Sequence, residues 1–397
     1  MRTILVLSQN AVFDLGNGAG KEVIYKTLNE LSRHFKIILI APGSNPQIRN
    51  CEFYNLPDYV FNKLKRIPII GYLYNFIHYF QLHLIVRKTI WKHKINPDLI
   101  YLAGPWMSSI GHSLYENKRP IIVRYFGVNW RPNKHYTIRQ KLKFYLKNKG
   151  YRKFGDLVIM TNDGTRGDEF LDLLNCPKDK LLFLPNGIDF IEYPFSKSES
   201  KKELIDTYGI PESNSILLTV SRLATWKRVD RAILGLKHAL KYNKKISLLI
   251  VGDGEERLNL QHLVQTEGLH EHVHFTGSIK HNNLGKYYAG CDLFLSLYDY
   301  SNAGNPLFEA MMNRCAIVTI DSPAMKYFIS EKSAFLLKES SPETVGLVIQ
   351  ELILDKERLL KYGLNAENEV KKNLLRWDDR IALEINKIIE LSGHQKS

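Results

Sequence analysis

Two positively charged side chains follow one apolar run in the second half of the sequence. Arg222 and Lys227 stand five residues apart, directly after the strand-like run 216–220 and before a helical stretch. A guanidinium is a planar fork and an ammonium is a point charge, and the two together suit the charge of a diphosphate. The spacing therefore indicates an anion-binding loop. In a chain with 55 lysines and arginines, two ordinary surface cations are the competing interpretation.

A helix start further along could complete such a site. An apolar run, a loop and a helical segment that begins at Pro306 follow one another within 293–313. Proline in the first turn leaves the backbone N–H groups around Asn305 and Leu307 pointing outward, where a phosphate can accept from them. Glu309, one turn in, can accept hydrogen bonds from a ribose diol, so the segment predicts a nucleotide site. A charge favoured by the helix dipole is the simpler alternative.

Parallel strands would have to position these groups. The chain opens with a strand, a glycine-bearing loop, a helix and a second strand, which is a βαβ arrangement. With 397 residues and 44% apolar content, the chain is long enough for two domains with separate cores. The pattern predicts an α/β fold of two Rossmann-like parallel-sheet domains, with ligands at the carboxyl ends of the strands. Strands are expected at 3–8, 37–41, 98–101, 121–125, 157–161, 216–220, 247–252, 272–275, 293–297 and 316–320.

The loop and helix around Glu309 resemble the donor-site signature of the family-4 retaining glycosyltransferases of GT-B fold, within the glycosyl transferases group 1. That signature is an acid, seven residues and a second acid. Glu309 matches the second acid, and Gly304, Pro306 and Ala310 match its surroundings. The resemblance implies that Glu309 holds the nucleotide ribose. Ser301 stands where the family has the first acid, which contacts the donor sugar.

The resemblance extends to other loops. It implies that Arg222 and Lys227 stabilise the departing diphosphate, and that these two residues and Glu309 form the catalytic set. The turn 252–255 resembles the family's G-x-G turn and is interpreted first as a packing turn and second as a ligand contact. The donor-binding residues implied are Gly18, Gly20, Phe126, Gly277, Ser278, Ser301, Gly304, Asn305, Pro306 and Leu307.

Two of these positions depart from the family pattern. Phe126 stands where the family commonly has a histidine that touches the donor sugar, and Ser301 replaces the first acid. A phenyl ring covers an apolar group but cannot hydrogen-bond a hydroxyl. The two departures together predict an unusual donor sugar such as a deoxyhexose. If the register differs by one residue, Arg124 or Tyr125 would line the site instead.

The domain boundaries follow from composition and from the resemblance. Residues 1–194 are expected to form an acceptor-binding domain, and 214–372 a nucleotide-sugar-binding domain. The stretch 195–213 is polar and rich in turn residues, so it is predicted to be the linker. The helical stretch 373–397 is either the last core helix of the second domain or a helix that crosses back to the first.

Charge and cysteine usage limit the partners. The net charge of +14 is concentrated in the first half: 61–96 contains seven basic residues and 117–155 contains twelve, both without an acid. No nucleic-acid-binding motif is present. Aromatic and aliphatic residues between the cations favour peripheral contact with an anionic membrane, and a solvated face is the alternative. The polar residues within 67–86 favour a segment that lies on a membrane rather than one that spans it. Four scattered cysteines and the absence of a signal-like start suit the cytoplasm, at the inner face of the membrane.

These observations favour one function. The chain is predicted to be a retaining hexosyl- or deoxyhexosyl-transferase that uses a nucleoside diphosphate sugar and a lipid-linked or cell-surface glycan acceptor, as in polysaccharide, lipopolysaccharide or capsule synthesis. No cofactor is expected, and no metal, since no D-x-D motif stands at a strand end. A non-catalytic nucleotide-sugar-binding scaffold, and an epimerase or phosphorylase on the same frame, are the alternatives.

Overall fold

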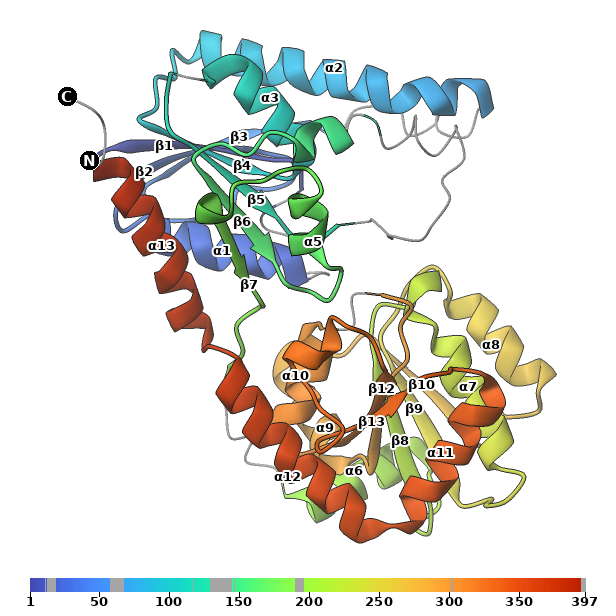
Figure 1. Ribbon diagram of the computed structural model, residues 1–397. Coiled ribbons are helices and arrows are strands. Elements are labelled where there is room, and N and C mark those ends of the chain that lie inside the picture. The colour runs from blue at the N-terminus through green and yellow to red at the C-terminus, as the bar shows by residue number, and fades with distance from the viewer. Residues whose placement is uncertain are drawn as a thin grey trace. The chain divides into compact units, whose positions relative to one another are not determined.

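The structure, a computed structural model, describes residues 1–10, 12, 19–57, 68–116, 118–128, 145, 147–189, 196–300 and 303–393. The chain divides into two compact units, each built on a parallel sheet (Figure 1). The first unit is formed by Met1–Asn162, Arg166–Asn186 and Trp377–Ser397, and the second by Asp163–Thr165 and Gly187–Arg376.

The described residues of the first unit contain a seven-stranded sheet in the order β3-β2-β1-β4-β5-β6-β7. Its central strands are mostly apolar and almost wholly buried, as expected for a parallel sheet that is covered on both faces. The order reverses between β1 and β4. The strands are β1 (Thr3–Ser8), β2 (Lys36–Ala41), β3 (Cys51–Asn55), β4 (Leu99–Ala103), β5 (Ile121–Tyr125), β6 (Leu157–Thr161) and β7 (Leu181–Leu184).

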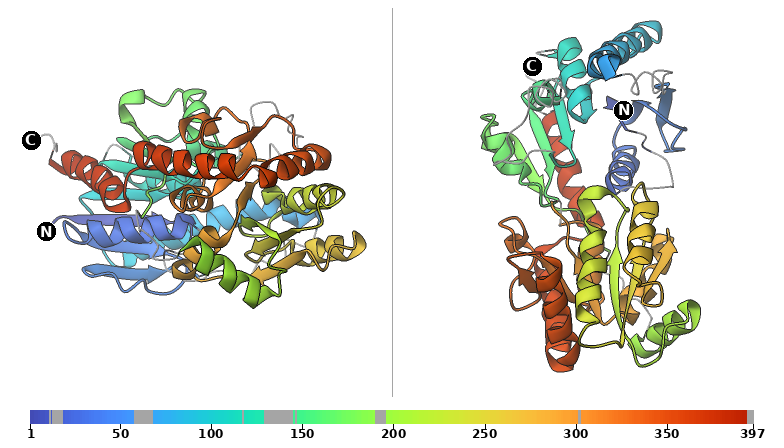
Figure 2. Two further views of the ribbon diagram at one scale, coloured as in Figure 1. Left: turned by 90° about the horizontal axis from the view of Figure 1, so that it is seen from below. Right: turned by 90° about the vertical axis from the view of Figure 1, so that its right-hand side faces the viewer.

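Helices cover both faces of this first sheet. One face packs against α1 and α13, which lie side by side (Figure 2), and the other against α2, α3 and α5. The C-terminal helix α13 therefore belongs to the first unit, whereas the sequence pattern left both units open. The helical segments are α1 (Ala19–Leu31), α2 (Pro68–Lys92), α3 (Pro105–Tyr115), α5 (Gly167–Asp172), the 3-10 turn η2 (Lys178–Lys180) and α13 (Trp377–Gly393).

A buried ionic cluster attaches α13 to this sheet. The side chain of Arg124 on β5 is 1% exposed and pairs with Glu384 of α13, which also pairs with Arg380 one turn earlier. Arg124 also donates to Thr161 Oγ1 at 3.1 Å, and Arg380 Nε donates to the carbonyl of Pro185 at 2.6 Å. Burial opposes ionisation of Glu384, but the two guanidinium groups hold its pKa below the usual value. Arg124 and Arg380 thus share one buried carboxylate inside the unit.

Over the part of the chain that the structure describes, the sheet of the second unit has the same strand order, without a seventh strand. Its described residues contain a six-stranded parallel sheet in the order β10-β9-β8-β11-β12-β13, which reverses between β8 and β11. Ligands of such sheets bind beyond the carboxyl ends of the strands at the point of reversal. The strands are β8 (Ser215–Val220), β9 (Ile246–Val251), β10 (Val273–Gly277), β11 (Leu293–Ser296), β12 (Ala316–Ile320) and β13 (Phe335–Leu337).

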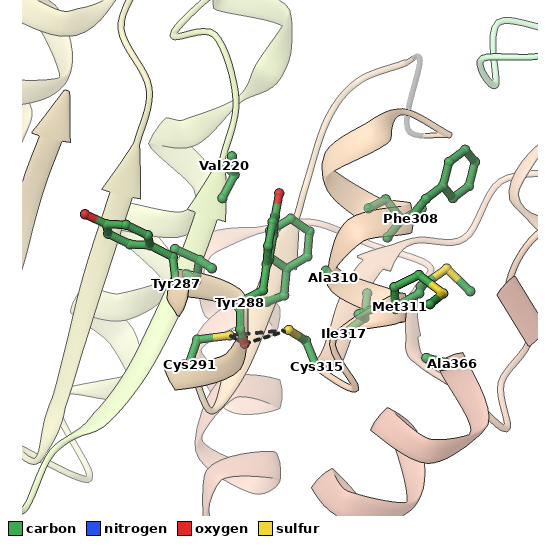
Figure 3. Packing of buried hydrophobic residues seen from close by; sticks show 14 of the residues in the cluster. Val220, Tyr287, Tyr288, Cys291, Phe308, Ala310, Met311, Cys315, Ile317 and Ala366 are labelled. Atoms are coloured by element: carbon green, nitrogen blue, oxygen red, sulfur yellow. Dashed lines mark hydrogen bonds between the residues drawn. The ribbon is translucent and has the colours of Figure 1, made fainter. Parts of the chain in front are cut away.

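Two apolar cores flank the second sheet. Helices α6, α9 and α10 pack on one face and α7, α8 and α11 on the other, while α12 contributes to both cores. Figure 3 shows part of the first of these cores, between α9, α10 and α12. The segments are α6 (Lys197–Tyr208), η3 (Thr225–Lys227), α7 (Val229–Ala239), α8 (Arg257–Thr266), η4 (His281–Asn283), α9 (Gly285–Gly290), α10 (Asn305–Met312), η5 (Met325–Tyr327), α11 (Pro342–Leu354) and α12 (Lys356–Asn373).

The stretch 195–213 differs from its prediction as a linker, because most of it forms α6 inside the second unit. Ser196 caps this helix: its hydroxyl accepts from the Glu199 N–H at 3.2 Å and donates to the Glu199 carboxylate at 2.7 Å. Leu204 is buried against α9. This S-x-x-E pair is a helix-start signal, and it outweighs the polar composition on which the linker prediction is based.

Among the helices formed by the described residues, none has the length and apolarity needed to cross a membrane.

Candidate functional site

The catalytic residues predicted from the sequence gather where the strand order of the second sheet reverses. The loop after β8 carries Arg222 and Lys227, and the loop after the neighbouring β11 leads into α10 with Glu309. The carboxyl ends of adjacent parallel strands lie at one edge of a sheet, so these side chains share that edge. The arrangement depends on the second unit alone.

Lys227 lies between two aromatic rings. Its ammonium nitrogen is 3.7 Å from the ring centre of Tyr298 and 4.1 Å from that of Trp226. Aromatic faces attract a cation without neutralising it. Burial lowers the pKa of Lys227 to about 7; the charge of Asp163 opposes this decrease, and the nearby Arg222 cation adds to it. Arg222 itself is exposed. Both cations are therefore arranged to gain from an incoming anion.

The next basic residue along the loop is already engaged. Arg228 donates to both carboxylate oxygens of Asp230, at 2.8 Å from Nη2 and 3.0 Å from Nε, and to Asp299 at 3.4 Å. Its backbone is left-handed, with φ of 49°, where the 3-10 turn η3 ends and α7 begins. Arg228 therefore shapes the loop.

Several hydrogen bonds join the loop after β8 to the loop after β11. The Tyr298 hydroxyl donates to the carbonyl of Val220 at 2.9 Å, and the Asp299 N–H donates to the carbonyl of Trp226 at 3.1 Å. Arg231 pairs with the Asp299 carboxylate at 2.8 Å. These contacts fix the two rings that flank the lysine.

The turn 252–255 after β9 packs against the loop that follows β8. A Cβ atom on Gly252, whose φ is +128°, would lie 1.8 Å from the carbonyl oxygen of Ser221, and one on Gly254 would lie 2.4 Å from that of Leu223. Only glycine fits such approaches. The turn therefore packs against the backbone that carries Arg222, which agrees with its first interpretation.

Glu309 is nearly buried and held from two sides. Its Oε2 accepts from the Tyr288 hydroxyl at 2.8 Å, and its Oε1 lies 3.0 Å from Nε2 of His281. Burial raises the pKa of Tyr298, and the charge of Glu309 raises it further, so the carboxylate lies near the ring that contacts Lys227. No local sequence pattern points to Tyr288 or His281, because they stand 21 and 28 residues before Glu309.

The start of α10 corrects one prediction. Gly304 is extended and has no capping side chain, so the Leu307 N–H donates to the Gly304 carbonyl at 3.0 Å. That amide does not point outward, because the uncapped first turn closes on itself. Pro306 occupies the first turn as expected, next to the half-buried Asn305.

The remaining predicted donor residues divide between the units. Gly277 ends β10 and Ser278 follows it at the same edge of the second sheet, where the Gly252 N–H donates to the Gly277 carbonyl at 2.9 Å. Gly20 is in the first turn of α1 in the first unit. Gly18 and Ser301 lie outside the described residues.

Phe126 follows β5 in the first unit. The centre of its ring lies 5.2 Å from the guanidinium carbon of Arg124, and the ring packs against the core formed with α1 and α13. The side chains of Arg124 and Tyr125, the alternatives under a shifted register, are buried. The Tyr125 hydroxyl donates to the carbonyl of Gly150 at 2.9 Å. Neither alternative lines a surface.

Comparison with known proteins extends these observations. Residues 200–369 match the family model of the glycosyl transferases group 1. The alpha-monoglucosyldiacylglycerol synthase of Streptococcus pneumoniae is 26% identical over 286 residues, which are 68% of this chain and 62% of that protein. The N-acetylgalactosamine-N,N'-diacetylbacillosaminyl-diphospho-undecaprenol 4-alpha-N-acetylgalactosaminyltransferase of Campylobacter jejuni is 24% identical over 370 residues, 91% of this chain and 93% of that protein.

Solved structures establish the fold. The Anabaena protein HepE in complex with UDP-glucose superposes with a TM-score of 0.72 at 17% sequence identity, over 98% of this chain and all of that one. Its architecture and that of this chain agree in two parallel-sheet α/β units. The chain therefore has the GT-B fold, and residues 200–369 of its second unit match the glycosyl transferases group 1.

Proposed function

We propose that this chain is a family-4 retaining glycosyltransferase, which moves a hexose or deoxyhexose from a nucleoside diphosphate sugar to a lipid-linked or cell-surface glycan acceptor. The observation that supports it best is the shared edge of β8 and β11. There, an exposed arginine, a lysine between aromatic rings and a clamped carboxylate meet at the point where sheets of this type bind nucleotides.

In the proposed reaction, the bond between the anomeric carbon and the diphosphate breaks, and negative charge grows on the departing diphosphate. Arg222 and Lys227 stabilise that charge, and the diphosphate gives the desolvated Lys227 ammonium a direct counter-ion beside its aromatic neighbours. Glu309 holds the ribose. Retention requires the acceptor oxygen to form its bond on the face that the diphosphate leaves, where an oxygen of the departing diphosphate can accept the proton of the acceptor hydroxyl. We expect no metal or cofactor, because these groups supply the positive charge.

The acceptor proposal draws on the relatives. The name of one refers to a glucosyldiacylglycerol and that of the other to a diphospho-undecaprenol, and both of these are lipids. A lipid-linked acceptor is presented at a membrane, so the enzyme would work at the cytoplasmic membrane face. We expect the acceptor to bind the first unit.

Helix α2 offers a surface for that contact. Its inner side packs into the core of the first unit through Tyr79, Leu82 and Val86. The outer side exposes Phe80, Leu84 and Trp91, together with three exposed cations near the end of the helix. Apolar side chains beside cations suit the interface of an anionic membrane. The cations are Arg87, Lys88 and Lys92.

The donor sugar is the least constrained part of the proposal. Phe126 and Ser301 replace polar family positions, so we expect a preference for a sugar with an apolar group, such as a deoxyhexose. Comparing turnover of deoxyhexose and ordinary hexose donors tests this, and a clear preference for the ordinary hexose contradicts it.

The reaction is tested with purified protein, a panel of nucleoside diphosphate sugars and membrane lipid extract as acceptor. Radiolabel transfer to lipid in the wild type and its loss in Lys227→Ala would support the proposal. Binding without transfer or hydrolysis would favour a scaffold, and isomerised donor without transfer would favour an epimerase. The anomeric configuration of the product, measured by NMR, decides between retention and inversion.

A further inference from the structure

The carboxylate of Glu309 has two side-chain partners of opposite character. On the inner side, the hydroxyl of the buried Tyr288 donates to Oε2 at 2.8 Å. On the outer side, Nε2 of His281 lies 3.0 Å from Oε1, and the histidine side chain is 53% exposed. Because an ionised carboxylate only accepts hydrogen bonds, Nε2 is the donor in this pair.

We propose that Tyr288 and His281 are positioning residues that aim the outer oxygen of Glu309 at the sugar hydroxyls of a nucleoside diphosphate. The inference rests on the proposed function, and it adds the two residues that turn an acid into an oriented hydroxyl-binding group. A glutamate has three rotatable bonds, so without partners its oxygens would not face one direction. Because Tyr288 is buried and His281 is half exposed, the oxygen on the histidine side, Oε1, is the one that a ligand can reach.

The hydrogen-bonding capacity of the carboxylate allows this division. Two carboxylate oxygens offer about four acceptor sites. Tyr288 occupies one on Oε2, His281 occupies one on Oε1, and Oε1 retains a second site for a sugar hydroxyl. Hydrogen bonds to a charged acceptor are stronger than neutral ones, so both partners hold the group firmly.

Helix α9 offers a matched control beside Tyr288. The adjacent Tyr287 is also buried, but its hydroxyl lies 2.7 Å from the hydroxyl of Tyr208 rather than near Glu309. Figure 3 shows the two tyrosine side chains leaving α9 in different directions. Tyr287→Phe therefore removes a comparable buried hydroxyl from the same helix without touching the carboxylate.

The test measures binding of UDP and GDP to the full-length chain by calorimetry, each compared with its 2′,3′-dideoxy form. We expect the wild type to favour the ribose form of the nucleotide that it binds by roughly tenfold or more, because a site built for a hydroxyl rejects the analogue that lacks it. In Tyr288→Phe and in His281→Ala, affinity for the ribose form should fall about tenfold while affinity for the dideoxy form stays constant. Tyr287→Phe should leave both affinities unchanged.

Each other result has a distinct meaning. Equal losses for ribose and dideoxy forms in Tyr288→Phe, or equal effects of Tyr288→Phe and Tyr287→Phe, would show a structural role and overturn the inference. The same holds if His281→Ala leaves the preference for ribose intact. A wild type that binds nucleotides without any preference for ribose overturns this inference alone. If neither nucleotide nor any of the nucleoside diphosphate sugars binds, the proposed function fails as well.

Discussion

The two units share one strand order and differ in how they use charge. In the first unit, Arg124 on the sheet is paired inside the core with Glu384 of α13, which Arg380 shares. In the second, Lys227 lies between two rings and Arg222 is exposed. A buried ion pair serves the fold, whereas a desolvated cation between aromatic rings raises the energy of the empty site until an anion arrives. The fold alone therefore does not make a binding site. A binding site also needs charged side chains, such as Arg222 and Lys227, that are positioned to pair with a ligand.

The two sheets also differ at the points where their strand order reverses. In the first unit, the side chain of Gln9 after β1 accepts from the Trp106 N–H at the start of α3, at 3.2 Å. A Cβ on Gly104 would collide with that glutamine at 2.3 Å. The chain itself thus occupies this helix start. In the second unit, the corresponding loops fix a lysine and a glutamate instead.

Breaking the ionic cluster of the first unit should have the largest effect. Glu384→Ala leaves two buried guanidinium groups without their counter-ion, so we expect the free energy of unfolding to fall by about 3–5 kcal/mol. Urea denaturation measures it. The matched control replaces all three charges, in Arg124→Met, Arg380→Met and Glu384→Leu together, and should recover most of the loss. A single variant as stable as the wild type would remove the contrast between the units.

Removing the charge of Lys227 in the second unit should lower activity and leave stability unchanged. Lys227→Met should lower transfer about a hundredfold, or roughly 3 kcal/mol, because one contact to the departing diphosphate is lost. It should not lower thermal stability, since a cation with a depressed pKa costs folding energy below pH 7, and that cost fades as pH rises toward the ordinary lysine value. Lys237→Met removes an exposed cation paired with Glu267 and should change neither property much. A parallel loss of stability and activity in Lys227→Met would make the lysine structural.

The same lysine predicts a pH dependence. The pKa of Lys227 is lowered to about 7 in the empty site, and a bound diphosphate should raise it, so binding above pH 7 takes up a proton. Affinity for UDP or GDP should therefore fall as pH rises from 7.5 to 9, by up to about tenfold per unit. Calorimetry in buffers of different ionisation enthalpy measures the uptake. Lys227→Met should bind weakly and show no such slope, whereas an unchanged slope would assign the proton elsewhere.

The strands that the sequence predicted best are those buried on both faces. The runs of β1, β5, β6 and β12 are mostly apolar, and their predicted bounds match the observed ones. The sheet edges β3, β7 and β13 were not predicted. They are only partly buried, and β13 has three residues, so their patterns resemble those of ordinary loops.

The site divides in a similar way. Arg222 and Lys227 were predictable because they directly follow a strand, and strand ends of a parallel sheet are where ligands bind. Tyr288 and His281 were not, since they reach Glu309 only through the tertiary fold. The partner of Arg124 lies 260 residues further along the chain. Local spacing predicts which groups stand at a strand end, but not which distant side chain neutralises or orients them.

The smallest expected effect concerns the outer side of α2. Phe80→Ser with Leu84→Ser should weaken binding to vesicles that contain anionic lipid by about tenfold, since both side chains are exposed and would lose apolar contact with the bilayer. Flotation measures the binding, and the free energy of unfolding should stay the same. The matched control is Leu258→Ser on α8 of the second unit, a leucine that is 78% exposed. If this control weakened binding equally, the effect would not be specific to α2. If neither variant weakened binding, α2 would not be the surface that contacts the membrane.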